Sequence, residues 1–136
     1  MKYLAIPLFL LCASAPAADS SKNAAIMGQW SGQMEGFTAI RMTVEELDGK
    51  IGGSVMFYML HRDAKGMTAT PTFPEPMFSP AFDGKTLTFK ISHRYAHPPR
   101  TLNDPPVDFR VEVTAPDKAT VYGPGTPPVE LSRERQ

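Results

Sequence analysis

The clearest pattern along the chain is a two-residue alternation of apolar and polar side chains. It runs through residues 40–45, 86–92 and 107–114, where β-branched and aromatic residues supply most of the apolar positions. This period is typical of strands that bury one face and expose the other. The same reasoning predicts a last strand over Val129–Arg133. No segment keeps a helical period for more than about one turn.

Turn residues separate these predicted strands. Asp48-Gly49 and Asp83-Gly84 are signals for two-residue hairpins, in which both residues take positive φ. Pro116-Asp117-Lys118 predicts a third turn, and the glycine- and proline-rich residues 123–128 predict a fourth. Short strands joined in this way predict an all-β fold, an antiparallel up-and-down barrel of about seven or eight strands.

The segment 51–60 is apolar on both faces in its second half. One face carries Val55 and Phe57, while the other becomes apolar at Met56, Tyr58 and Leu60. Two interpretations fit this pattern. The chain that follows folds back over the second face, or that face is an exposed patch for an envelope protein or for self-association.

Two long, proline-rich segments, residues 61–80 and 93–106, lack the alternation and are expected to be loops. Loops of this length are uncommon without a function. We expect both to lie at the same end of the barrel, either as simple covers or as the mouth of a cavity. The candidate mouth residues are Phe73, Phe78, Arg94, Tyr95 and Arg100.

The first 17 residues have the layout of a signal peptide. Lys2 precedes an apolar run of about ten residues, and Ala15-Pro16-Ala17 offers small residues for cleavage after Ala17. Such a run is too short for a stable membrane span, although an uncleaved anchor is the alternative. The mature chain is therefore expected to be secreted or periplasmic, with residues 18–26 as a flexible leader, residues 27–136 as one barrel domain, and no transmembrane span.

Cys12 is the single cysteine, and the bulky Leu11 before it departs from the pattern of a lipid-acceptor site. Cleavage after Ala17 removes it, which excludes disulfide and thiolate chemistry from the mature chain. The charge of the chain excludes a further class of function. The 14 lysine and arginine residues equal the 14 aspartate and glutamate residues in number. A net charge of zero argues against nucleic-acid binding by a basic surface.

The first predicted strand opens with Gly28-Gln29-Trp30, and Arg133 stands near the end of the last one. A Gly-x-Trp opening in an up-and-down β-chain of this size resembles the calycin superfamily, which includes the lipocalins and the fatty-acid-binding proteins. The resemblance implies that Trp30 closes one end of the barrel and that Arg133 packs across its indole, with Arg135 as a second candidate. Such a contact is a favourable cation–π interaction.

Catalytic and metal-binding motifs are missing from the sequence. No serine-hydrolase elbow, zinc-protease motif or phosphate loop occurs, so we expect no enzyme activity and no cofactor. His61, His93 and His97 are weak metal candidates. In an extended strand His93 and His97 would stand about 13 Å apart, which is too far to share one ion.

The apolar inward positions suggest either a packed core or a cavity for a small ligand. Our leading hypothesis is a barrel that binds a small hydrophobic molecule. Its candidate cavity residues are Met42, Val44, Val55, Phe57, Met59, Phe89, Ile91, Phe109 and Val111. The alternative is a packed barrel that acts as an interaction module of the cell envelope.

Overall fold

The computed structural model describes residues 22–92 and 105–135. Within these residues, ten strands form one antiparallel sheet. The strands are β1 Gly28–Met34, β2 Phe37–Leu47, β3 Lys50–Asp63, β4 Gly66–Pro71, β5 Glu75–Pro76, β6 Phe78–Phe82, β7 Thr86–Ile91, β8 Val107–Ala115, β9 Lys118–Tyr122 and β10 Val129–Arg133. Their order is β4-β3-β2-β1-β10-β9-β8-β7-β6, with β5 paired to β3 off this path. The expected all-β, antiparallel character is therefore confirmed.

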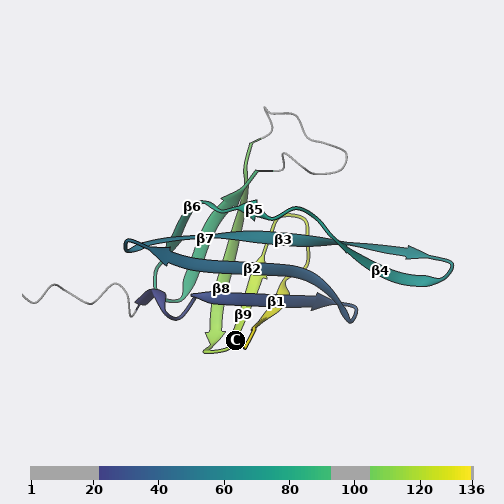
Figure 1. Ribbon diagram of the computed structural model, residues 1–136, viewed down its shortest axis with the longest axis horizontal. Helices are drawn as coiled ribbons and strands as arrows, with labels where there is room; N and C mark the ends of the chain where they lie inside the picture. Colours follow the sequence, from purple (N-terminus) through teal and green to yellow (C-terminus); the bar gives the residue numbers. More distant parts are fainter. Residues whose placement is uncertain (1–21, 93–104, 136) are drawn as a thin grey trace, which may run out of the picture.

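The sheet curls into an open half-barrel, so the expectation of a closed barrel of seven or eight strands was wrong. Figure 1 shows β1–β3 running across the direction of β7–β9, as a strongly curled sheet requires. Near the open edge of the curl, β5 makes the residue pairs Ser54↔Pro76 and Val55↔Glu75 with β3, and the Met77 N–H donates to the carbonyl of Gly53 at 3.0 Å. Beyond Phe57, where its pairing with β2 ends, β3 pairs with β4 alone, and the two project as a hairpin (Figure 1).

Residues 61–80 contain strands, which corrects the expectation of a long loop. β3 continues to Asp63, and β4, β5 and part of β6 follow. The prolines that made this segment resemble a loop lie in β4, β5 and β6. Each of these strands has a neighbour on only one side in the sheet order. Proline lacks an N–H, and such positions tolerate it because no second ladder requires that donor.

Two hairpins show different turn chemistry. Asp48 and Gly49 have φ of 51° and 75°, so both lie in the left-handed region as predicted. At the Asp83-Gly84 turn, by contrast, only Gly84 has positive φ. Asp83 instead accepts hydrogen bonds on Oδ1 from the N–H groups of Lys85 and Thr86, at 2.8 and 2.7 Å. Asp83 thus acts through its side chain, as aspartate often does in turns.

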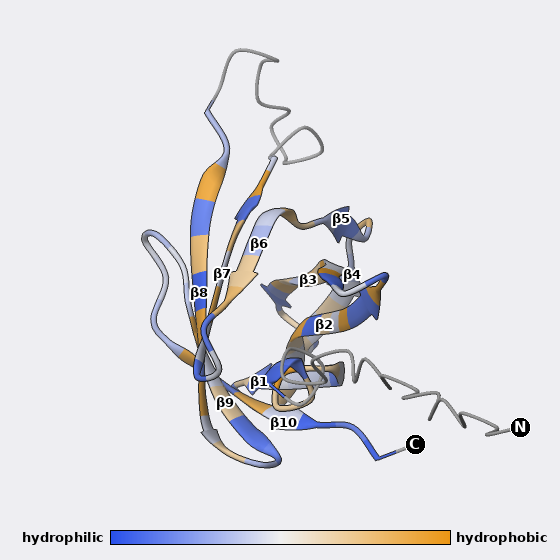
Figure 2. Cartoon of the chain, turned by 90° about the vertical axis from the view of Figure 1, so that its left-hand side faces the viewer, coloured by the Kyte–Doolittle hydropathy of each residue, from blue (hydrophilic) through white to orange (hydrophobic). Residues whose placement is uncertain are grey.

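The inward side chains form one apolar core. Figure 2 shows the underlying alternation along β8. The ring of Phe109 lies between those of Phe57 on β3 and Phe89 on β7, with centroids 5.5 and 5.7 Å apart. These three rings connect the two halves of the curled sheet, and aromatic pairs at this spacing add to the burial of their area.

The end of the half-barrel near the start of β1 is closed by the chain that precedes it. Residues 22–26, part of the expected leader, form a helical turn, and Ile26 is fully buried. Trp30 is also fully buried, and its indole N–H donates to the carbonyl of Ile26 at 2.9 Å. This part of the leader segment therefore belongs to the core.

Candidate functional site

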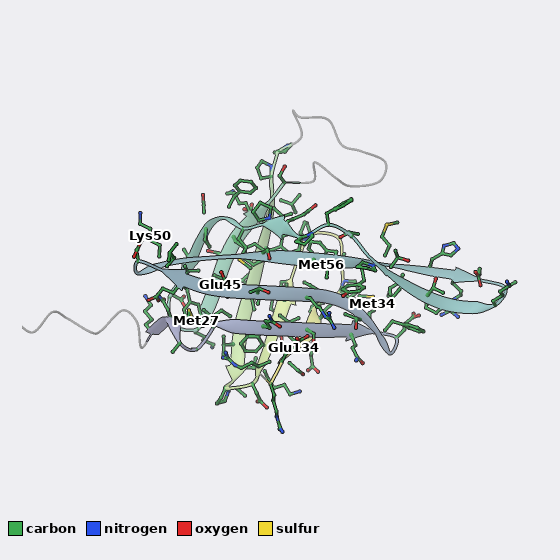
Figure 3. The ribbon with its side chains drawn as sticks, in the orientation of Figure 1. Met27, Met34, Glu45, Lys50, Met56 and Glu134 are labelled. Atoms are coloured by element: carbon green, nitrogen blue, oxygen red, sulfur yellow. The ribbon has the colours of Figure 1, made fainter. Side chains whose placement is uncertain are left out.

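A cavity of about 380 Å³ opens at the other end of the half-barrel. It lies between β2–β3 on one side and β8–β10 on the other. Its walls are formed by Met34, Ala39, Ile40, Phe57, Tyr58, Leu60, Val107, Phe109, Val121, Gly123, Pro124, Thr126, Pro127 and Val129. Figure 3 places Met34 at the end of the sheet from which the β3–β4 hairpin projects, opposite Lys50.

An irregularity in β2 shapes the first wall. Gly32 pairs with Ile40 whereas Gln33 pairs with Thr38, so β2 carries one extra residue, Ala39. Such a bulge bends the strand and turns neighbouring residues to the same side. As a result both Ala39 and Ile40 line the cavity.

The loop between β9 and β10 forms the opposite wall. It contributes Gly123, Pro124, Thr126 and Pro127. A Cβ atom on Gly123 would stand only 2.6 Å from the Phe109 ring, so glycine is required for this close approach. The position of the Phe109 ring in the cavity wall thus depends on the absence of a side chain at residue 123.

The cavity walls carry no charge among the described residues that form them. The side-chain hydrogen-bonding groups in the lining are the hydroxyls of Tyr58 and Thr126. A nearby charged pair, Arg62 and Glu35, links the hairpin to the β1–β2 turn at 3.0 Å and is exposed. A charged ligand would lose its hydration in this cavity without gaining an opposite charge, which is costly. The lining therefore suits an uncharged ligand.

Only part of the predicted cavity set lines this space. Phe57 and Phe109 do, whereas Met59 is 53% exposed. Beyond Phe57 the strand is no longer paired with β2, and the hairpin turns Tyr58 and Leu60 toward the cavity in place of Met59. The remaining predicted residues are buried in the core outside the cavity wall: Met42, Val44, Val55, Phe89, Ile91 and Val111.

The predicted mouth residues do not gather at this cavity in the described part of the chain. Phe73 and Phe78 are 68% and 46% exposed, and neither lines it. Arg94, Tyr95 and Arg100 lie outside the described residues. Of the proposed patch, Met56 is half-buried on the outer face, while Tyr58 and Leu60 are half-buried in the cavity wall. β4 runs beside this stretch of β3 and pairs with it at Tyr58↔Pro71 and Leu60↔Ala69.

The structure brings Trp30 and Arg133 together at the closed end. The guanidinium carbon of Arg133 lies 4.3 Å from the centroid of the indole. Arg133 also donates hydrogen bonds to the carbonyls of Ala25, Met27 and Pro116. One side chain therefore joins β10 to the N-terminal turn, to the β8–β9 turn and to the face of Trp30.

Sequence reasoning missed Glu75. It is 8% exposed, and it is the one buried acidic or basic residue in the described ranges. Its partner Val55 is fully buried and directed inward, and paired residues share a face, so the Glu75 carboxyl also points inward. Oε2 has no hydrogen-bond partner among the described residues, and burial raises the pKa of this carboxyl above its usual value. A single glutamate in a proline-rich segment offers no sequence signal for such a position.

Residues 22–92 and 105–135 were compared with the arrangements typical of metal sites and membrane helices. In these ranges no three histidine, cysteine or acidic side chains gather as metal ligands do. His61 is exposed, whereas His93 and His97 lie outside the described residues. In the same ranges no helix has the length and apolar character needed to cross a membrane.

Comparisons of the chain with known protein families, with curated proteins and with solved structures give no match.

Proposed function

We propose that the protein binds one small, uncharged, hydrophobic molecule in the cavity between β2–β3 and β8–β10. The observation that carries this proposal is the uncharged, largely apolar lining of a space of about 380 Å³. Ligand pockets commonly have about 300–1,000 Å³ and are lined mainly by apolar and aromatic side chains. The volume lies near the lower limit, which favours a small ligand.

Burial of apolar ligand surface would drive binding, at about 25 cal/mol per Å² removed from water. The rings of Phe57 and Phe109 offer flat contact surfaces in the wall. The hydroxyls of Tyr58 and Thr126 offer positions for one polar group of the ligand. Such a ligand would be oriented by one or two hydrogen bonds and held by contact area.

We further propose that the chain is a divergent, calycin-like half-barrel. Support comes from Gly28-x-Trp30 at the start of β1 and from the Arg133 guanidinium 4.3 Å from the indole centroid. The open sheet departs from the closed barrel of that superfamily. A structure determined with ligand would test whether the cavity stays open on that side.

Export to the periplasm or the cell exterior is the proposed location. It rests on the signal-peptide layout of residues 1–17, which lie outside the described residues. The intact mass of the protein recovered from a cell-envelope fraction tests it. A chain that begins at Ala18 supports export, and a full-length cytosolic chain refutes it.

A titration with N-phenyl-1-naphthylamine, an uncharged probe that fluoresces in apolar surroundings, tests the binding site. We expect saturable binding of one probe per chain. Ala39→Phe places a ring in the cavity wall and should weaken binding about tenfold or more, equivalent to about 1.4 kcal/mol. Thr38→Phe is the matched control, because Thr38 is the neighbouring residue and does not line the cavity.

The two variants should have melting temperatures close to that of the wild type, measured by circular dichroism. Equal probe binding by the wild type and Ala39→Phe would place the probe elsewhere and refute the site. Absence of binding in the wild type, with this and with other small uncharged probes, would favour a packed interaction module.

A further inference from the structure

Glu75 lies where the curled sheet is joined most weakly. Residues 72–77, which we name the seam, connect β4 to β6 along the far side of β3 from β2. Three backbone features tie the seam to β3. Thr72 N–H donates to the carbonyl of Phe57 at 2.9 Å, β5 makes two residue pairs, and Met77 N–H donates to the carbonyl of Gly53 at 3.0 Å.

The seam is also connected to the proposed ligand site. The Phe57 carbonyl accepts two hydrogen bonds from Thr72, one from its N–H and one from its hydroxyl at 2.8 Å. Phe57 and the next residue, Tyr58, both line the cavity. Release of the seam would therefore free a backbone position in the cavity wall.

The core that Glu75 faces is apolar in the described part of the chain. On β3 the positions that share its face are Gly53, Val55 and Phe57. The other core residues in the described ranges are likewise without charge: Ile26, Trp30, Ile40, Met42, Val44, Met77, Phe82, Leu87, Phe89, Ile91, Phe109, Val111, Ala119, Val121 and Leu131. The other buried polar residue, Asn23, donates to Glu46 at 2.5 Å. A charge on Glu75 has no described partner, so it favours a conformation in which the carboxyl reaches water.

We infer that ionisation of Glu75 opens the seam and thereby lowers the affinity of the cavity for its ligand. Protonated Glu75 stays inside and keeps the seam paired to β3. Deprotonated Glu75 moves outward, and the hydrogen bonds at Thr72 and Met77 are lost with it. The part of this inference that concerns affinity rests on the proposed ligand site, whereas the opening of the seam does not.

The sign of the pH dependence follows from the protonation states. Burial raises the pKa of Glu75 above the ordinary value of 4.5, so the closed form binds the proton more tightly than the open form. The closed form is fully favoured below that ordinary value and loses its advantage as the pH rises through the raised pKa. We therefore expect a closed seam in acid and an open seam at higher pH.

Hydrogen exchange tests the seam directly in the whole protein. Protection factors, which remove the intrinsic effect of pH on exchange, are measured at pH 4.5 and pH 8. Those of the Thr72 and Met77 amides should fall about tenfold or more at pH 8. The amide of Val113 is the internal control, since it donates to Lys85 in the β6–β7 turn at 2.9 Å and makes no bond to the seam. Its protection factor should change little.

Variants identify the group responsible. Glu75→Gln and Glu75→Met remove the charge and should give pH-independent protection at Thr72 and Met77. Glu45→Gln is the matched control, because Glu45 is exposed on the outer face of β2 (Figure 3) and its loss should leave the wild-type pH dependence intact. Unchanged wild-type protection across this range, or an equal fall in Glu75→Gln, would overturn the inference.

Probe binding separates this inference from the proposed function. Binding of N-phenyl-1-naphthylamine should weaken about tenfold between pH 4.5 and pH 8 in the wild type but not in Glu75→Gln. Binding that is equally tight at both pH values overturns the coupling while the ligand site stands. No binding at either pH, together with Glu75-dependent exchange, refutes the ligand site and leaves the opening of the seam established.

Discussion

Truncation of Trp30 tests the closed end of the half-barrel most directly. Its side chain is fully buried, its indole N–H donates to the carbonyl of Ile26, and its ring lies under the Arg133 guanidinium. Trp30→Ala removes all three interactions at once. It also leaves a space that the surrounding β-strands can fill only in part.

The expected decrease in the free energy of unfolding follows from these three interactions. Truncation of a large buried aromatic residue to alanine costs about 3–5 kcal/mol in the free energy of unfolding. We expect the upper part of this range, because the Ile26 carbonyl also loses its donor. Trp30→Phe keeps a ring but leaves that carbonyl unpaired, which should cost about 1–3 kcal/mol. The Trp30–Arg133 contact itself should appear as a coupling energy of about 0.5–2 kcal/mol.

Urea unfolding followed by far-ultraviolet circular dichroism measures these energies. Fluorescence is unsuitable for the comparison, since Trp30 is the single tryptophan. The wild type, Trp30→Leu, Arg133→Met and the double variant form a cycle that isolates the coupling, because leucine fills part of the space but offers no aromatic face to the guanidinium. A loss below about 1 kcal/mol for Trp30→Ala, or a coupling near zero, would refute the role of this pair at the closed end. If Trp30→Ala does not fold, the cycle still decides the question.

Three further predictions concern other parts of the fold. Gly53→Ala should lower the free energy of unfolding in urea by about 1–3 kcal/mol, because the new Cβ atom would stand 2.0 Å from the Thr43 carbonyl oxygen. Gly52→Ala is the control, since a Cβ atom there meets open space, and it should be neutral or slightly stabilising. Asp83→Ala should destabilise the protein at neutral pH, because two turn N–H groups donate to the Asp83 carboxylate and lower its pKa below 3.8. The stability that these bonds provide is present above pH 3.8 and is lost as the pH falls through the lowered pKa. The wild type and the variant should therefore reach the same stability in acid. A constant difference down to pH 2 would contradict this. Glu75→Met should raise the free energy of unfolding at pH 8 by about 1–3 kcal/mol and much less at pH 4.5, and a destabilised variant at pH 8 would show that the carboxyl has a partner.

Local patterns predicted the central strands well. β7, β8 and β10 lie within one residue of their predicted positions, because each alternates strictly and one face is buried. The turn at Asp48-Gly49 has the predicted geometry for a similar reason, since its conformation depends on two adjacent residues. The Trp30–Arg133 contact was anticipated by resemblance and by the position of each residue at the end of its predicted strand.

The strands with one neighbour and the cavity were predicted poorly. β4, β5 and β6 are short and contain proline, so they show no clear alternation, and they are strands because a neighbouring strand supplies their hydrogen bonds. The cavity walls depend on the extra residue Ala39 in β2 and on the close approach of Phe109 to Gly123. Neither feature follows from period or composition, and for this reason most predicted cavity residues lie in the packed core instead.

The sequence alone determined the all-β antiparallel class, the positions of the central strands and the side of each of them that is buried. These properties arise from interactions between residues close in the chain, and alternation and turn chemistry record them. Only the tertiary structure decided that the sheet remains an open half-barrel, that Tyr58 and Leu60 replace Met59 at the cavity, and that the Glu75 carboxyl is buried. Each of these depends on which distant segments pack together when the sheet curls. The free energy of that packing comes from many contacts between residues far apart in the chain, and no local pattern contains them.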